Sequence, residues 1–533
     1  MKTWMQRAAF AVIGLAVSAC GSEPADDTAT LHRGNRIEPL TLDPHVAVIS
    51  GERTIIADMF AGLFEPAADA SPIPGLAQSY TVSTDGLIWT FDLREASWSD
   101  GAPITAGDVV YGLQRALDPM TRNQYPAPLF LIENAQAIAE GRASVDTLGV
   151  RAVDERTVVI RVNYPAPYLP SVLMYWGQPV PRHVVDVHGD SWVRAENMVV
   201  SGPFQLAEWR SNDFIHLTAN PEFYAADAIC LTDIFYYPTI DTASAERRVR
   251  NGELDLNIEF SGANLEFLQA RNPEILEMGP GVVVRDVTFN NALAPFDDVR
   301  VRRALSMAID RRFIANAVLA GADTATFRLV PDGVTGQGAG VGLDFADQPM
   351  DQRRAEAGRL LAEAGFGPDN PLEVTLYYQP SAGWPRIAPV IQQDWALIAP
   401  WVRAEVAVRD SQLHYDAMRV GDFQVASSGW VGDFDDPYAY LLQYEGRASE
   451  INYSRWNDPE FDRLVAQALN TPDVEARATL LAQAEQLFLD ASGFAPIFVE
   501  SRKHLVGSRV TGWITNPFGV NQSRWMCVTE PAP

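Results

Sequence analysis

The feature that most constrains the fold is a regular alternation of helix and strand patterns between residues 350 and 430. Such an alternation needs crossover connections and favours a mostly parallel sheet, so the chain is predicted to be α/β. In sheets of this kind, ligands bind beyond the carboxyl ends of the strands. The spacing of apolar residues predicts helices over 352–364, 387–398 and 411–418, and strands over 372–378, 404–408 and 423–428.

An acidic stretch follows the last of these strands. Trp430 is followed by three acids, Asp433, Asp435 and Asp436. Asp433 comes after an apolar run, where a fixed carboxylate is suited to receive a cation such as the amino end of a peptide. The alternative is an ordinary solvated turn, marked by Pro437. The local sequence leaves both interpretations open.

Upstream, a long helix is predicted from about Val299 to Leu319. Asp298 stands at its start as a capping residue, and Gly321 stands near its end. Its apolar residues recur at helical spacing.

The N-terminus has the pattern of an export signal. Positive charges at Lys2 and Arg7 flank an apolar run that ends at Ala19 and is too short to span a bilayer. The run leads into Cys20, as in the cleavage box of bacterial lipoproteins, where this cysteine carries the lipid. A plain signal peptide with a chance cysteine is the alternative. We expect a lipoprotein signal peptide over 1–20, lipidation at Cys20, and a flexible tether over 21–30.

Charge and cysteine content narrow the class of protein. The formal net charge of −27 disfavours binding to nucleic acid or to anionic lipid, and suits neutral or cationic ligands. With 47% hydrophobic residues over this length, more than one domain is expected. After export, Cys230 and Cys527 either form a disulfide or stay as buried thiols. Spacing alone does not decide between the two.

Enzyme motifs are missing from the sequence. The seven histidines form no His-Glu-x-x-His, and neither a Gly-x-Ser-x-Gly elbow nor a phosphate loop occurs. His183 and His188 are weak metal-ligand candidates, and surface or capping roles suit them better. The absence of these motifs does not exclude catalysis, but nothing in the sequence requires it, and we predict no catalytic residue, metal site or cofactor.

Several sequence blocks stand in a characteristic order along the chain: Leu42-Asp43-Pro44-His45, Trp89-Thr90-Phe91-Asp92-Leu93-Arg94, Trp98-Ser99-Asp100-Gly101, Pro295-Phe296-Asp297-Asp298-Val299-Arg300 and Leu360-Leu361-Ala362-Glu363-Ala364-Gly365. Together they resemble the family 5 solute-binding proteins of bacterial ABC importers, most closely the oligopeptide-binding proteins. The resemblance implies a periplasmic-binding-protein-like α/β clamp of two lobes with an extra third domain, the type II, large cluster C form.

The resemblance also implies a domain layout. Domain I would combine 31–60, 200–285 and 505–533, domain II would span 61–199, and domain III would span 286–504. Cys230 and Cys527 then fall in the same domain, which favours a disulfide between them.

The implied mechanism is capture of an oligopeptide by hinge closure, for delivery to the permease subunits of an ABC transporter. The family places an acid for the peptide ammonium shortly after Gly-Trp, and here that acid is Asp433. Tyr125 matches a tyrosine that reaches the ligand across the cleft, and Trp430 would form a wall. For both, a place in the core is the alternative. The remaining implied contacts are two main-chain rails, the strand Ser427–Gly429 with Ser428 and the segment Val46–Gly51 with Val48 and Ser50. Val431 is a further candidate ligand-binding residue.

Departures from the family pattern fall at the carboxyl end of the expected site. Ser427 replaces an arginine found in relatives that accept tripeptides, and Trp384 stands near the place of a carboxylate-binding histidine. Arg285, Arg386 or Arg419 could receive a ligand carboxylate instead, with a surface arginine as the alternative for each. Trp384 and Arg419 are therefore included among the candidate ligand-binding residues.

Other functions remain open from the sequence. The ligand could be another amine-bearing compound or a metal complex, and the protein could sense peptides rather than import them. We expect an exported monomer in the periplasmic space or at the outer face of the cell membrane, held there by its lipid anchor alone.

Overall fold

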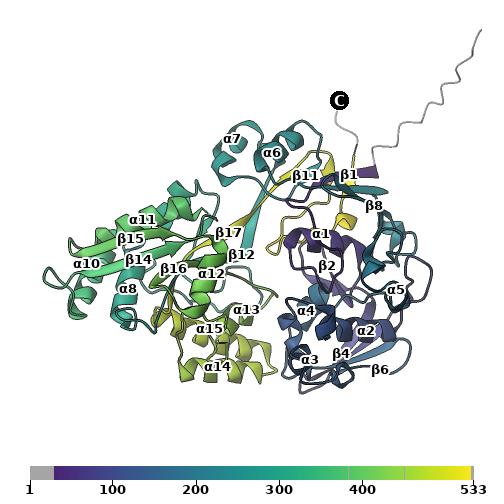
Figure 1. Ribbon diagram of the computed structural model, residues 1–533, viewed down its shortest axis with the longest axis horizontal. Helices are drawn as coiled ribbons and strands as arrows, with labels where there is room; N and C mark the ends of the chain where they lie inside the picture. The colour runs from purple at the N-terminus through teal and green to yellow at the C-terminus, as the bar shows by residue number, and fades with distance from the viewer. Residues whose placement is uncertain (1–28, 382, 449, 530–533) are drawn as a thin grey trace, which may run out of the picture.

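The computed structural model describes residues 29–529, except 382 and 449 (Figure 1). The predicted signal peptide, Cys20 and nearly all of the predicted tether lie outside the described residues. Figure 1 shows two bodies side by side, the green one on the left and the purple-to-blue one on the right, connected at the top. No helix among the described residues is long and apolar enough to cross a membrane.

One 11-stranded sheet runs through the connection between the bodies, in the order β15-β14-β16-β12-β17-β11-β1-β10-β9-β8, with β13 (Thr324–Ala325) beside β17. Its two longest strands, β12 (Leu276–Phe289) and β17 (Phe494–Val506), pair antiparallel along most of their length. Their register shifts between Gly279 and Val283 and again between Arg285 and Asp286. The predicted domain boundaries at 285 and 504 both lie inside these two long strands.

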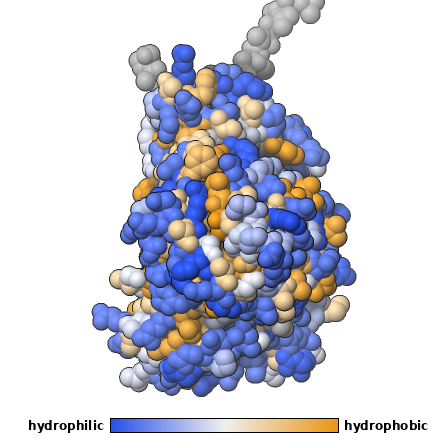
Figure 2. Space-filling view, turned by 90° about the vertical axis from the view of Figure 1, so that its left-hand side faces the viewer, coloured by the Kyte–Doolittle hydropathy of each residue, from blue (hydrophilic) through white to orange (hydrophobic). Residues whose placement is uncertain are grey.

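The left-hand body contains the predicted alternation of helix and strand. Its elements are α10 (Met350–Glu363), β14 (Leu372–Tyr378), α11 (Trp384–Ala396), β15 (Val402–Val408), α12 (Ser411–Val420) and β16 (Val425–Val431). β14 is parallel to both β15 and β16, which confirms the crossover prediction, whereas β16 pairs antiparallel with β12 on its other side. The face of this body that points away from the other is mostly hydrophilic, with apolar residues in small groups (Figure 2).

The prediction of a single helix over 299–319 is wrong. α8 (Val299–Ala308) ends at Ile309, which has an extended backbone with φ −71° and ψ 122°. A short helix α9 (Arg311–Phe313) and a π-helical turn η9 (Ile314–Val318) follow. The break has a local cause, because the Asp310 side chain accepts the Phe313 N–H and thereby caps a new helix. The Asp310 N–H in turn donates to Asp394.

The right-hand body is built on a four-stranded antiparallel sheet, in the order β4 (Ala77–Val82), β5 (Ile88–Leu93), β7 (Thr157–Arg161) and β6 (Val150–Ala152). β5 buries Trp89, Phe91 and Leu93 and leaves the residues between them partly exposed, as its alternating sequence predicts. A second, two-stranded sheet joins β2 (Phe64–Pro66) to β3 (Pro72–Pro74). The helices of this body are α1 (Ser50–Met59), α2 (Ala106–Leu117), α3 (Ala135–Ala139), α4 (Leu169–Trp176) and α5 (Arg182–His188).

The upper region carries the remaining strands of the large sheet and the chain ends (Figure 1). Cys230 and Cys527 are joined by a disulfide, with Cα atoms 5.3 Å apart. This bond ties β19 (Cys527–Val528), near the C-terminus, to the segment between β9 and β10. The other elements here are β1 (Thr30–Gly34), β8 (Phe204–Arg210), β9 (Phe214–Ala219), β10 (Asp233–Tyr237), α6 (Thr242–Arg250), β11 (Leu256–Asn257), α7 (Leu265–Arg271) and β18 (Val510–Thr511).

The Leu42–His45 block fixes the first loop against the right-hand body. Arg115 of α2 makes two hydrogen bonds to Asp43, at 3.0 and 2.6 Å, and Trp192 Nε1 adds a third at 3.2 Å. His45 contacts the Gln178 carbonyl through Nε2 at 2.9 Å. Burial lowers the pKa of His45 to about 4, so its ring is neutral at pH 7. These contacts attach the Leu42–His45 block to the right-hand body. The block therefore has a structural role and does not face a ligand cleft.

Candidate functional site

The three acids after β16 have different partners. Asp436 is paired with Arg477 of α15 (Val474–Asp490) through bonds of 2.6 and 2.8 Å. Asp435 accepts the backbone N–H of Thr335 at 2.8 Å and its hydroxyl at 2.5 Å. Both acids therefore anchor the segment to the body behind it. Only Asp433 is directed across to the other body.

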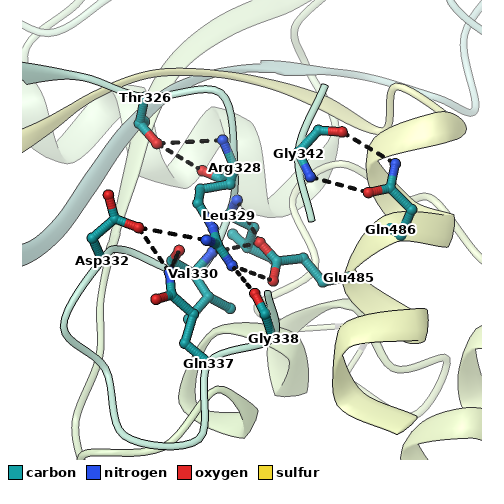
Figure 3. A network of polar contacts seen from close by, with 10 residues as sticks. All are labelled: Thr326, Arg328, Leu329, Val330, Asp332, Gln337, Gly338, Gly342, Glu485 and Gln486. Carbon is teal, nitrogen blue, oxygen red and sulfur yellow. Dashed lines mark hydrogen bonds and ion pairs between the residues drawn. The ribbon is translucent and has the colours of Figure 1, made fainter. Parts of the chain in front are cut away.

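The loop that carries Thr335 is itself fixed to α15 (Figure 3). Glu485 accepts the N–H groups of Leu329 and Val330 at 3.0 and 2.9 Å, and lies 3.7 Å from the Arg328 guanidinium. Gln486 bonds both backbone groups of Gly342, at 3.0 and 3.2 Å. Arg477, the partner of Asp436, also lies on α15. The same helix therefore supports both contacts of the acidic segment, directly through Arg477 and indirectly through the loop that carries Thr335. This support fixes the direction of Asp433.

Asp433 meets Tyr125 from the right-hand body. The Tyr125 hydroxyl donates a hydrogen bond to Asp433 Oδ2. Burial raises the pKa of Asp433, and the Tyr125 hydrogen bond and the nearby Arg53 oppose that rise. Burial and the Asp433 charge together raise the pKa of Tyr125, which stays a neutral donor. The structure therefore brings together two residues that the sequence predicts for the site, from opposite bodies.

Arg53 is a third member of the site that sequence reasoning missed. It lies on α1, with its guanidinium carbon 3.4 Å from the centroid of the Trp176 ring. It donates to the carbonyls of Tyr175 and Ala47, each at 3.1 Å. Burial lowers the pKa of Arg53 to about 10, so it stays charged at pH 7. Nothing in its sequence surroundings distinguishes it from a surface arginine of a helix.

The site therefore combines one carboxylate, one guanidinium and two aromatic rings. The Tyr125 and Trp176 rings are 5.4 Å apart between centroids. Within the described residues, Arg53 and Asp433 form no ion pair closer than 4 Å. Asp433 thus has a neutral partner, Tyr125, and a cation at longer range.

β16 offers an open edge beside Asp433. The Gly432 N–H donates to the Val282 carbonyl of β12 at 3.3 Å. Because backbone groups alternate in an antiparallel ladder, those of Trp430 and Ser428 also point to β12, and those of Gly429 and Val431 point to the opposite edge.

β14 covers this opposite edge only beside Val425 and Ala426. The Ser427 carbonyl accepts a hydrogen bond from His414 Nε2 at 2.7 Å. In the described part of the chain, the backbone groups of Gly429 and Val431 on this edge have no partner. Of the predicted rail Ser427–Gly429, only Gly429 is therefore available among the described residues, together with the candidate Val431, whereas Ser427 and Ser428 are engaged.

The segment predicted as the second rail, Val46–Gly51, leads into a helix. Ser50 is the first residue of α1. Glu52 accepts the N–H groups of Val48 and Ile49, both at 3.0 Å, and so caps the start of this helix. The family resemblance does not predict that Glu52 occupies these backbone N–H groups.

Trp430, Trp384 and Arg419 occupy different surroundings. Trp430 is half-buried, and its indole N–H donates to the Ala439 carbonyl at 2.7 Å. Trp384 is fully buried in the core at the start of α11, so it does not line the cleft. Arg419 is exposed near the end of α12 and pairs with Asp416 at 2.6 Å. The expectation that Trp384 and Arg419 contact a ligand finds no support in their positions.

A cavity of about 380 Å³ also opens between the two bodies, but Asp433 does not line it. Among the described residues, no group of three or more His, Cys, Asp or Glu side chains is arranged to hold a metal ion. The cavity is lined by Asn163, Tyr164, Glu445, Arg447, Asp462, Ala466, Leu469 and Asn470.

Comparisons with known proteins agree on the family. The model of the "Bacterial extracellular solute-binding proteins, family 5 Middle" matches residues 71–450. The chain is 32% identical over 514 residues to the periplasmic oligopeptide-binding protein OppA of Salmonella typhimurium, covering 94% of each chain. It is 33% identical over 491 residues to the probable deoxycholate-binding periplasmic protein YgiS of Escherichia coli, covering 91% of this chain and 90% of the relative.

The fold is also similar to that of solved structures. The unliganded open form of the periplasmic murein tripeptide-binding protein MppA superposes with a TM-score of 0.83 at 31% identity. The match covers 94% of this chain and 98% of that one, so it extends over the whole multidomain clamp and confirms the predicted type of fold. The chain belongs to the family 5 bacterial extracellular solute-binding proteins.

Proposed function

We propose that this protein is the extracytoplasmic substrate-binding subunit of a peptide ABC importer. It captures oligopeptides by hinge closure, pairs with their main chain, and binds their amino terminus through Asp433. The observation that carries the proposal is the position of Asp433, a largely buried carboxylate at the end of an open strand edge with a neutral hydroxyl as its bonded partner.

The chemistry of Asp433 suits an ammonium ligand. A buried carboxylate is costly unless a cation and hydrogen bonds compensate it. A peptide ammonium carries three donors, so it can bond Asp433 while the Tyr125 hydroxyl retains one carboxylate oxygen. Arg53 is held by two carbonyls and a Trp176 stack and does not reach Asp433, which leaves this role to the ligand.

The open edge of β16 suits the rest of a peptide. An extended chain added to a strand edge gains main-chain hydrogen bonds whatever its side chains are. Gly429 and Val431 supply a donor and an acceptor each on this edge. This mode of binding explains how one protein accepts peptides of different sequence.

Contacts between the bodies support closure as the mechanism. The ring of Tyr168, the residue just before α4, stacks on Phe434 with centroids 4.3 Å apart, next in sequence to Asp433, which contacts Tyr125. Arg477 lies over the same Tyr168 ring at 5.4 Å. β12 and β17 are the continuous connection about which the bodies would turn, and their register shifts give a place for bending.

The wider assignment follows the same proposal. We assign domain I to 31–60, 200–285 and 505–533, domain II to 61–199, and domain III to 286–504. The relatives named above are periplasmic by name, and a periplasmic or outer-face location with a lipid anchor at Cys20 fits the N-terminal pattern. The protein would act as a monomer that delivers peptide to permease subunits.

Replacing Asp433 tests the proposal. Asp433→Asn is expected to keep the melting temperature of the ligand-free protein but to remove the stabilisation given by tri- or penta-alanine, because the amide cannot balance the ammonium charge. Asp416→Asn is the matched control: it makes the same change at an exposed acid of α12 that pairs with Arg419, and it should keep the stabilisation by peptide. Equal stabilisation of wild type and Asp433→Asn would refute the assigned contact.

Deoxycholate serves as a second ligand in this experiment, because one relative is named for it. Deoxycholate has no ammonium group, so the proposal expects it to bind no better to wild type than to Asp433→Asn. Strong stabilisation by deoxycholate with none by peptides would replace the peptide assignment.

A further inference from the structure

The side chain of Arg285 fills the space beside Gly429. A Cβ built on Gly429 would lie 2.7 Å from both Cδ and Nη1 of Arg285, the residue directly opposite on β12. The glycine is thus required because the arginine side chain crosses the strand at this point. The Arg285 guanidinium therefore lies against β16 where the open edge begins.

The Arg285 guanidinium has hydrogen-bond donors that the described residues do not engage. Its Nε donates to Glu500 Oε1 at 2.7 Å. No acceptor within the described residues bonds its two Nη atoms, and 19% of the side chain is exposed. A guanidinium held from one side by a carboxylate keeps the other edge of its planar fork for a second, bidentate partner.

The geometry of β16 fixes how a ligand would meet this fork. Asp433 lies beyond the carboxyl end of β16, so a peptide that starts there and follows the strand has to run antiparallel to it. If its first residue lies beside Val431, its third lies beside Gly429, about 7 Å further along. Residues opposite each other in antiparallel strands project side chains on the same face. The third ligand residue is therefore directed to the face that Arg285 occupies.

We propose that Arg285 binds a carboxylate of the ligand at its third residue, either the terminal carboxylate of a tripeptide or an acidic side chain of a longer peptide. This inference rests on the proposed function, because the register starts from an amino group at Asp433. It assigns Arg285 as a specificity-determining residue. A lysine would supply the charge at this position but not the planar fork that matches a carboxylate.

The test is a calorimetric titration with tri-alanine, tri-alanine amide and Ala-Ala-Asp amide, all with free amino groups. Wild-type protein is expected to bind one or both carboxylate peptides at least about 10-fold more tightly than tri-alanine amide. Arg285→Gln should reduce that preference, measured as the ratio of the affinities for the carboxylate peptides and for tri-alanine amide in the same variant, to within about 2-fold. Preference for tri-alanine identifies the terminal carboxylate, and preference for Ala-Ala-Asp amide identifies the side chain.

Arg403→Gln is the matched control. Arg403 lies on β15 of the same sheet and pairs with Glu373 of the neighbouring strand at 3.2 Å, but it is exposed. This variant removes the same charge and should keep the wild-type preference. Arg285→Lys should lose most of the preference, because it retains the charge without the fork.

Two results would overturn the inference alone. One is equal wild-type affinity for the amide and both carboxylate peptides, a comparison that needs no variant to fold. The other is a preference that survives in Arg285→Gln. In both cases, binding that N-acetylation abolishes would leave the proposed function standing. If none of the three peptides binds, both the inference and the proposed function fail.

Discussion

The ion pair between Arg477 and Asp436 is predicted to hold the acidic segment in place. The two side chains are 4% and 6% exposed and share two hydrogen bonds. Removing one partner of a buried pair typically costs about 3–5 kcal/mol, because the other charge stays buried. Burial raises the pKa of Asp436 against the opposing effect of Arg477. Without Arg477, Asp436 can take up a proton, which places the expected cost of Arg477→Met near the lower end, about 3 kcal/mol.

Urea unfolding followed by tryptophan fluorescence measures this cost. Asp436→Leu alone should be similarly destabilising, and the double variant should cost clearly less than the sum of the two changes, since it leaves no unpaired charge. Arg463→Met is the matched control on α14 (Pro459–Leu469). Arg463 pairs with Glu460 at the surface, with side chains 49% and 52% exposed, so its removal should cost less than about 1 kcal/mol.

The reasoning fails if Arg477→Met is as mild as Arg463→Met, or if the two single changes add up in the double variant. A further consequence concerns binding. Since Arg477 helps to fix the direction of Asp433, Arg477→Met should also weaken peptide binding at urea concentrations where the protein is still folded.

Two further predictions concern pH and redox state. Burial raises the pKa of Asp286 to about 7, so the folded protein keeps a proton that the unfolded chain releases near pH 4, and this contribution to stability falls as pH rises between these values. Asp286→Asn should therefore stabilise the protein by about 3 kcal/mol more at pH 8 than at pH 4.5 in urea unfolding, and a pH-independent difference would contradict this. The Cys230–Cys527 disulfide spans 297 residues, so its reduction should remove up to about 5 kcal/mol by chain entropy. An unchanged melting temperature with both thiols shown free by mass spectrometry would contradict that estimate.

The elements of the α/β body were predictable because their patterns are local. β14 has the predicted bounds, Leu372–Tyr378, since its apolar residues alternate and Pro371 precedes them. The break after α8 was not predictable from periodicity. It depends on Asp310. Its side chain caps a new turn, and its backbone N–H donates a hydrogen bond to Asp394, more than 80 residues away in sequence.

The site was predictable in part. Family resemblance pointed to Asp433 and Tyr125, and local sequence could not tell which of three neighbouring acids faces the cleft. That distinction depends on Arg477 and Thr335, which are distant in sequence and engage the other two. The pairing of β16 and the capping by Glu52 decide which backbone groups are free, and both are tertiary features.

The positions of the arginines show the same limit. Arg53 and Arg419 look alike in sequence, as single arginines within helices. The structure stacks Arg53 on Trp176 beside the site and leaves Arg419 at the surface. Such differences arise from the packing of separate segments, and no local pattern encodes them.

The measurement that tests the central claim most directly is the affinity of the wild-type protein for tri- or penta-alanine with a free and with an acetylated amino terminus. Acetylation removes the charge that would pair with Asp433. Since breaking a buried pair from one side costs about 3–5 kcal/mol, the affinity should fall by at least about 100-fold. Equal affinity of the free and acetylated peptides would contradict the assignment of Asp433 as the anchor for the peptide amino terminus.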